Sequence, residues 1–199
     1  PEFALGLAVF SVRDAGILLP RQDKRIFALQ LHQWARKGWI CRLKRGLYEM
    51  TYPEPAATSD FLVANRLYEP SYVSLETALS HYQILPETAA QVTSVTCMPT
   101  RRFKNHYGLF TYFTVRPAAF AGYTLRRLQG QTIRIAEPEK AVVDRLYAGL
   151  RRGESLQPVE DRWDLERLKK MHRKKLMSYA ALFGAAAKKL EKLIYDLLR

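Results

Sequence analysis

Residues 39–50 read WICRLKRGLYEM, and their pattern is the strongest indication of how the N-terminal part of the chain folds. Two short apolar-containing segments, 39–43 and 47–50, flank the connection Lys44-Arg45-Gly46. A glycine in a short connection between two such segments is typical of a β-hairpin. The stretch therefore predicts a hairpin that carries two adjacent positive charges at an exposed tip.

Two helices are expected before the hairpin. Ser11 is placed to cap a short helix, which Pro20 then ends. A longer helix is expected from about 23 to 37, ending at Gly38, with Phe27, Leu31 and Trp34 on one buried stripe. On a helical wheel the opposite face carries Gln22, Arg25, Leu29, His32, Gln33 and Arg36.

A short helix, a turn, a longer helix and then a basic hairpin form the order of a winged helix-turn-helix, which places its second helix in the major groove of DNA. We expect this domain over residues 4–52. The segment TYPEPAATS, 51–59, contains two prolines and marks the domain boundary. A solvated polar face and a protein-binding winged helix are the alternatives.

Residues 60–199 mix helical and strand patterns. A helix is expected from Phe61, and Ser74 is placed to cap another over 75–83. Strands are expected at 92–96, 109–115 and 131–136, and Pro138 opens a helix that continues to Tyr147. Further helices are expected within 163–183 and over 185–198. The fold class is therefore α+β: an N-terminal winged helix-turn-helix, then a mixed α/β domain with a helical C-terminal end.

Composition limits the possible functions. The 199 residues include 32 Lys or Arg and 19 Asp or Glu, giving a net charge of +13 and a pI near 9.9. An excess of this size favours a polyanionic partner. Apolar residues make up 48%, which excludes wholesale disorder, and no apolar run is long enough to span a bilayer. The two cysteines cannot form a disulfide framework, so we expect a cytoplasmic protein.

The C-terminal quarter is the most basic region. Residues 151–199 carry thirteen Lys or Arg against seven Asp or Glu. A solvated helix face is the simpler interpretation of this charge. The alternative is a set of auxiliary phosphate contacts, formed by Lys169, Lys170, Arg173, Lys174 and Lys175.

Four segments together resemble the AbiEi family of antitoxin-type transcriptional regulators. They are Leu43–Tyr48, Tyr72–Tyr82, Thr93–Thr96 and Ala136–Ala141. The resemblance covers roughly residues 10–185, with Gln83 as a departure where the family more often has glycine. It implies a DNA-binding repressor of its own promoter, with repeat sequences as the expected target, and an antitoxin domain over 60–199 that counteracts a nucleotidyltransferase-like toxin in phage defence. It also implies a set of DNA contacts: Arg21, Gln22, Arg25, Gln33, Arg36, Lys44 and Arg45.

No catalytic, metal or cofactor motif is recognisable, so we expect no enzyme activity and no cofactor. The histidines lack metal-ligand spacing, and the cysteines do not complement them. Glu137 and Glu139 suit the positive end of the helix that follows. A small nuclease using Glu137, Glu139 and Lys140, a regulator without a toxin partner, and a basic adaptor that binds only protein remain as alternatives.

Overall fold

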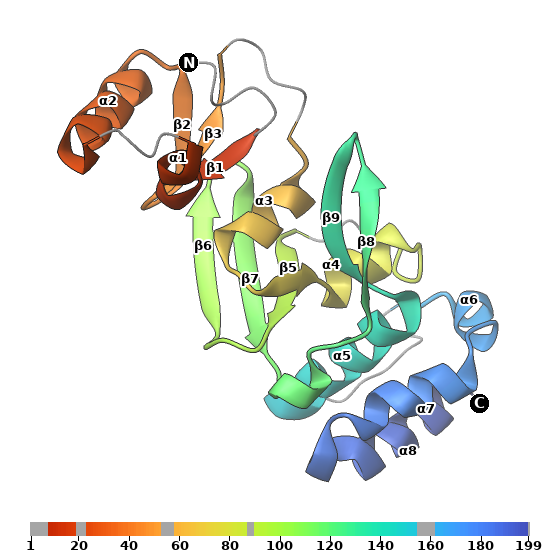
Figure 1. Ribbon diagram of the computed structural model, residues 1–199. Coiled ribbons are helices and arrows are strands. Elements are labelled where there is room, and N and C mark those ends of the chain that lie inside the picture. The colour runs from red at the N-terminus through yellow and green to blue at the C-terminus, as the bar shows by residue number, and fades with distance from the viewer. Residues whose placement is uncertain (1–7, 19–22, 53–57, 87–89, 155–161, 199) are drawn as a thin grey trace.

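The computed structural model describes residues 8–18, 23–52, 58–86, 90–154 and 162–198 (Figure 1). The N-terminal unit has a three-stranded antiparallel sheet in the order β1-β3-β2 and two helices. Its elements are β1 (Val9–Ser11), α1 (Val12–Leu18), α2 (Lys24–Arg36), β2 (Ile40–Lys44) and β3 (Leu47–Met50). The predicted hairpin and longer helix are confirmed within about one residue at each end.

Local hydrogen bonds explain where the first two helices begin. The Ser11 hydroxyl accepts from the Asp14 amide at 3.1 Å, and the Asp14 carboxylate accepts from the Ser11 amide at 2.7 Å. This reciprocal cap confirms Ser11 as the predicted N-cap. Asp23 caps α2 by accepting from the amides of Arg25 and Ile26. Gly46 supplies the left-handed backbone, φ +78°, that the hairpin turn requires.

The second unit is built on a six-stranded mixed sheet in the order β6-β7-β5-β4-β9-β8. The pairs β5–β7 and β4–β9 are parallel, and the other neighbouring pairs are antiparallel. The strands are β4 (Ser71–Val73), β5 (Val92–Thr96), β6 (Arg101–Asn105), β7 (Gly108–Thr114), β8 (Tyr123–Leu128) and β9 (Gln131–Ala136). The predicted strands at 92–96, 109–115 and 131–136 are confirmed, whereas β4, β6 and β8 were not predicted.

Helices cover both faces of this sheet. Tyr112 of β7 donates to the Ala64 carbonyl of α3 (Asp60–Leu67), and its neighbour Phe113 packs on Tyr147 of α5 (Pro138–Arg152). Because successive strand residues point to opposite faces, α3 and α5 lie on opposite sides of the sheet. The remaining helices are α4 (Leu75–His81), α6 (Leu165–Lys169), α7 (Arg173–Ala181) and α8 (Ala187–Leu197).

Helices α7 and α8 pack beneath α5 (Figure 1). Leu190, Ile194 and Leu197 of α8 are buried in the same apolar core as the sheet. The apolar stripe of the helix predicted over 185–198 therefore forms intramolecular core. The structure also confirms an α+β chain with a mixed sheet. Within the described ranges, no helix is long and apolar enough to cross a membrane.

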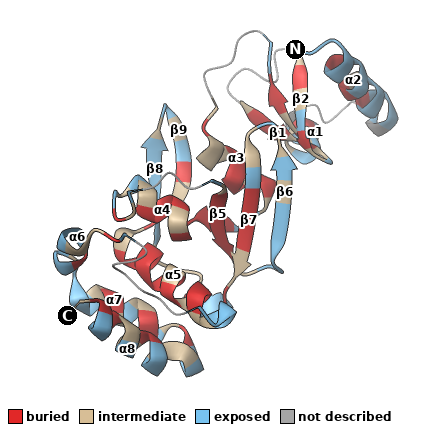
Figure 2. Ribbon diagram, turned by 180° about the vertical axis from the view of Figure 1, so that it is seen from behind, coloured by how far each residue is buried: buried red, intermediate tan, exposed pale blue. Residues whose placement is uncertain are grey.

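A buried charged pair lies between α5 and the start of α4. The Lys140 ammonium donates to Asp144, which also accepts from the Tyr72 hydroxyl at 3.0 Å and the Ser74 hydroxyl at 2.8 Å. Both charged side chains are fully buried, and α5 is red along most of its length in Figure 2. Ser74 lies at the predicted N-cap position of α4, but its hydroxyl makes no capping hydrogen bond and donates to Asp144 instead.

We predict that Asp144→Ala lowers the free energy of unfolding by about 3–5 kcal/mol, because it leaves the Lys140 ammonium buried without a counter-charge. Urea denaturation measures the loss. Replacing both partners, as in Lys140→Met with Asp144→Leu, should recover much of it. Equal losses in the single and double variants would contradict this account of the pair.

Candidate nucleic-acid interface

One face of α2 is buried in the N-terminal unit, and its outer face is exposed to solvent. Phe27, Leu31 and Trp34 face inward and pack in a small core with Phe10 and Ile40. The opposite face is open to solvent, and Figure 2 shows it pale blue and turned away from the six-stranded sheet. Its exposed polar side chains are Arg25, His32, Gln33 and Arg36.

The charge of α2 has one sign. Lys24, Arg25 and Arg36 are basic, and the helix contains no Asp or Glu. The adjacent carboxylate, Asp23, is used in capping the first turn. Basic residues at a helix N-terminus are unfavourable, because that end carries partial positive charge. The basic first turn therefore does not serve the stability of the helix, and an anionic partner would account for it.

Two large apolar side chains lie on this same basic face. Ile26 is 60% exposed and Leu29 is 65% exposed. Single exposed apolar residues are ordinary on protein surfaces, but these two lie one helical turn apart among cationic and amide groups. The exposed face of α2 therefore combines apolar and cationic side chains.

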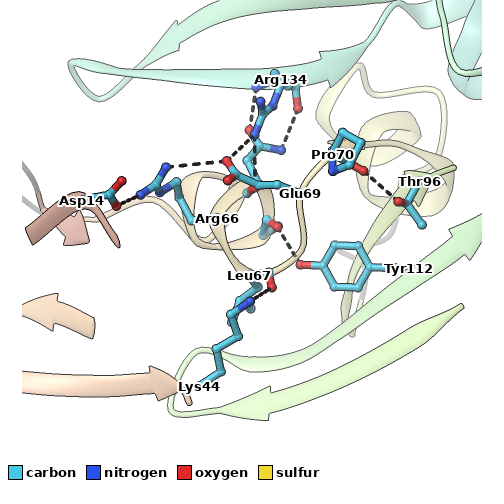
Figure 3. Close-up of polar contacts among 11 residues, drawn as sticks. Asp14, Lys44, Arg66, Leu67, Glu69, Pro70, Thr96, Tyr112 and Arg134 are labelled. Atoms are coloured by element: carbon cyan, nitrogen blue, oxygen red, sulfur yellow. Dashed lines mark hydrogen bonds and ion pairs between the residues drawn. The ribbon is translucent and has the colours of Figure 1, made fainter. Parts of the chain in front are cut away.

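The hairpin tip is docked on the second unit, which corrects the expectation that both of its charges are exposed. The Lys44 ammonium donates to the carbonyl oxygen of Leu67, at the end of α3, at 2.6 Å (Figure 3). It also lies 5.6 Å from the centre of the Phe103 ring. A cation is favourable at the negative end of a helix. Burial lowers the pKa of the Lys44 ammonium. Lys44 is therefore a contact between the units, whereas its neighbour Arg45 remains exposed.

An ion-pair network continues this contact. Arg66 of α3 pairs with Asp14 of α1, and it also lies 3.6 Å from Glu69 (Figure 3). Glu69 in turn accepts from Arg134 of β9 at 3.0 Å. Apolar packing supports the same contact, because Val9 of β1 and Leu43 and Leu47 of the hairpin belong to the core cluster of the second unit. The N-terminal unit is thus attached to the sheet by both charge and apolar burial.

A second polar cluster joins β2 and β3 to the β6–β7 turn. Glu49, which is buried, accepts from the Tyr107 hydroxyl and lies 3.1 Å from His106 Nε2. His106 Nδ1 lies 3.5 Å from the Cys41 sulfur. Burial and the neighbouring Glu49 charge raise the pKa of the Cys41 thiol, which disfavours the nucleophilic thiolate. The described residues also include no group of three or more His, Cys, Asp or Glu side chains arranged to hold a metal ion.

The other predicted DNA contacts have mixed outcomes. Arg25, Gln33 and Arg36 lie together on α2, whereas Arg21 and Gln22 lie outside the described residues. Two of the five predicted auxiliary phosphate contacts are held in ion pairs. Lys169 pairs with Glu166 at 3.3 Å, and Lys175 pairs with Glu137 at 2.6 Å. The bond with Glu137 raises the pKa of Lys175, which keeps this ammonium charged but paired. Lys170, Arg173 and Lys174 are exposed, and Arg173 lies over the Tyr195 ring at 4.2 Å.

The residues of the nuclease alternative do not meet at a site. Lys140 is buried on Asp144, as described above. Glu137 and Glu139 are directed to Lys175 instead, at 2.6 and 3.7 Å. A nuclease of this type needs carboxylates and a lysine exposed together to bind a metal and a phosphate. The geometry therefore gives no support to this alternative.

The sequence matches no protein-family model and no curated protein. In fold, the chain is similar to the crystal structure of the RV2827C protein from Mycobacterium tuberculosis, with a TM-score of 0.57 over 99% of this chain. The similarity covers 77% of that chain at 16% sequence identity. At this identity it is a likeness of fold alone.

The residues that join the two units were missed by sequence reasoning. Asp14 and Arg66 are separated by 52 positions, and Glu49 and Tyr107 by 58. Neither helical nor strand periodicity relates such distant positions, so no local signal could have paired them. The exposed apolar pair on α2, by contrast, was detectable in the sequence, because Leu29 falls on the polar side of the helical wheel.

We predict that Lys44→Met lowers the free energy of unfolding by about 1 kcal/mol, because it keeps the side-chain stem over Phe103 but removes the donor to Leu67. Urea denaturation is the measurement. Arg45→Met, at the adjacent exposed position, is the matched control and should leave stability unchanged. If the two variants lose the same stability, the docking role assigned to Lys44 is wrong.

Proposed function

We propose that the chain is a DNA-binding transcriptional repressor that reads duplex DNA with the outer face of α2. The observation that carries this proposal is the composition of that face: Arg25, Gln33 and Arg36 are exposed together on a helix that contains no carboxylate. A solvated surface helix commonly mixes both signs of charge. A face whose charged side chains are all cationic suits a polyanion.

The side chains of this face are those that read base edges. Arginine donates two hydrogen bonds to O6 and N7 of guanine, and glutamine pairs with N6 and N7 of adenine. An α-helix fits the major groove of B-form DNA, where these groups are displayed. Arg25 and Arg36 are eleven positions apart, so they span about 16 Å along the helix axis at a rise of about 1.5 Å per residue.

The order of elements supports a winged helix-turn-helix as the binding module. Strand β1 leads into α1 and α2, and the β2–β3 hairpin follows with β3 between the other two strands. In such a module the second helix, here α2, is the recognition helix. Since Lys44 is engaged by α3, Arg45 is the hairpin residue that we assign to phosphate contact.

The antitoxin half of the proposal is supported by the resemblance to AbiEi regulators. Two of the segments that carry it meet in the core of the second unit. Tyr72 and Ser74 come from one segment and Lys140 from another, and all three surround Asp144. The residues that resemble the AbiEi family therefore include core residues of the second unit. On the basis of this resemblance we propose that the second unit acts against a nucleotidyltransferase-like toxin.

We predict that Arg25→Ala and Arg36→Ala each weaken binding to a promoter duplex by about tenfold, corresponding to loss of about 1–3 kcal/mol per base contact. Fluorescence anisotropy over a range of salt concentrations is the measurement. Wild-type affinity should fall steeply as salt rises, because bound phosphates release counterions.

Arg151→Ala is the matched control, since Arg151 is an exposed helical arginine at the end of α5. It removes the same charge from the chain and should leave affinity nearly unchanged. If Arg25→Ala and Arg36→Ala both bind as tightly as Arg151→Ala, α2 is not the DNA-reading element.

The antitoxin role has a separate test. Co-expression of the chain with a nucleotidyltransferase-like protein encoded beside it should restore growth that this protein alone inhibits. Failure of rescue with such a neighbour would leave the repressor as the whole of the proposed function.

A further inference from the structure

We propose that Leu29 and Ile26 read thymine methyl groups, so that the sequence bound by α2 contains A·T pairs at the centre of its contact. This inference rests on the proposed function and names the chemistry of the DNA that α2 selects. It starts from an unusual exposure: the two side chains are 65% and 60% accessible on the candidate reading face.

Leu29 occupies the centre of that face. On a helix, neighbours on the same surface lie three and four positions away. For Leu29 these neighbours are Arg25 and Ile26 on one side and His32 and Gln33 on the other, all of them exposed. Any surface that meets Arg25 and Gln33 together must therefore also cover Leu29.

The major groove offers one large apolar group, the C5-methyl of thymine. The donors and acceptors along the base edges would lose water on meeting Leu29 without gaining a hydrogen bond. Gln33, one turn further along α2, has the side chain that pairs with adenine, the partner base of thymine. The leucine and the glutamine therefore suit neighbouring A·T pairs.

An exposed apolar helix face could instead bind a second copy of the chain. A symmetric contact places the same patch on both partners. Arg25 and Arg36 would then approach the same basic face of the other copy, where α2 supplies no carboxylate to pair with them. DNA provides the opposite charge around the patch and an apolar group at its centre, so we assign the face to DNA.

The experiment compares thymine with deoxyuridine, which lacks only the methyl group. A duplex is selected from a library with a randomised core by the full-length chain, and the enriched duplex is then made with thymine or with deoxyuridine in that core. Wild type should bind the thymine duplex about fourfold more tightly for each methyl group read, the ratio that about 0.8 kcal/mol produces. The Leu29→Ala/Ile26→Ala variant should bind both duplexes equally.

Two controls make the result specific. Leu125→Ala removes a leucine of equal exposure, 66%, from β8 and should keep the wild-type ratio. Arg25→Ala should bind both duplexes more weakly and also keep the ratio. If wild type binds both duplexes equally, if selection enriches no sequence, or if the double variant keeps the ratio, the methyl-reading inference is overturned while DNA binding by α2 stands.

Two other outcomes have their own meaning. If the double variant dissociates a dimer in sedimentation velocity and keeps the thymine preference, the apolar patch belongs to a contact between copies and the inference is overturned. If wild type binds no duplex at all, the proposed function itself is wrong.

Discussion

At the tip of the β2–β3 hairpin, the ammonium of Lys44 is held against the last carbonyl of α3 and over the ring of Phe103. This contact places a positive charge at the negative end of a helix dipole and covers apolar surface with the lysine stem. With Arg66 paired to Asp14, and Leu43 and Leu47 buried in the larger core, it fixes the N-terminal unit on the six-stranded sheet. The position of α2 depends on this attachment.

The attachment gives the two basic residues of the hairpin different environments. Lys44 is a structural contact, whereas Arg45 and the outer face of α2 are exposed, and we propose that they bind DNA. A helix that is held rigidly loses less conformational freedom on binding than a tethered one, which would favour affinity and a defined orientation. The cluster around Glu49 joins β2 and β3 to the β6–β7 turn, so Tyr107 and Leu67 both bind the small sheet to the second unit.

The sequence predicted those elements whose structure depends on residues close together in the chain. The spacing of Phe27, Leu31 and Trp34 predicted both α2 and its outer face, because one helical period determines them together. β6 was missed because Arg101, Arg102 and Lys104 hide its strand pattern at an exposed sheet edge. The burial of Lys44 could not be predicted, since its partner lies 23 residues away and depends on how the two units pack.

We propose that α2 binds DNA while the hairpin tip stays docked on the second unit. Amide hydrogen exchange of the full chain, with and without saturating duplex DNA, distinguishes this arrangement from others. We expect DNA to slow exchange across Lys24–Arg36 and to leave exchange in residues 42–44 as slow as it is without DNA. Unchanged exchange in α2, or a hairpin tip whose exchange accelerates when DNA binds, would contradict it.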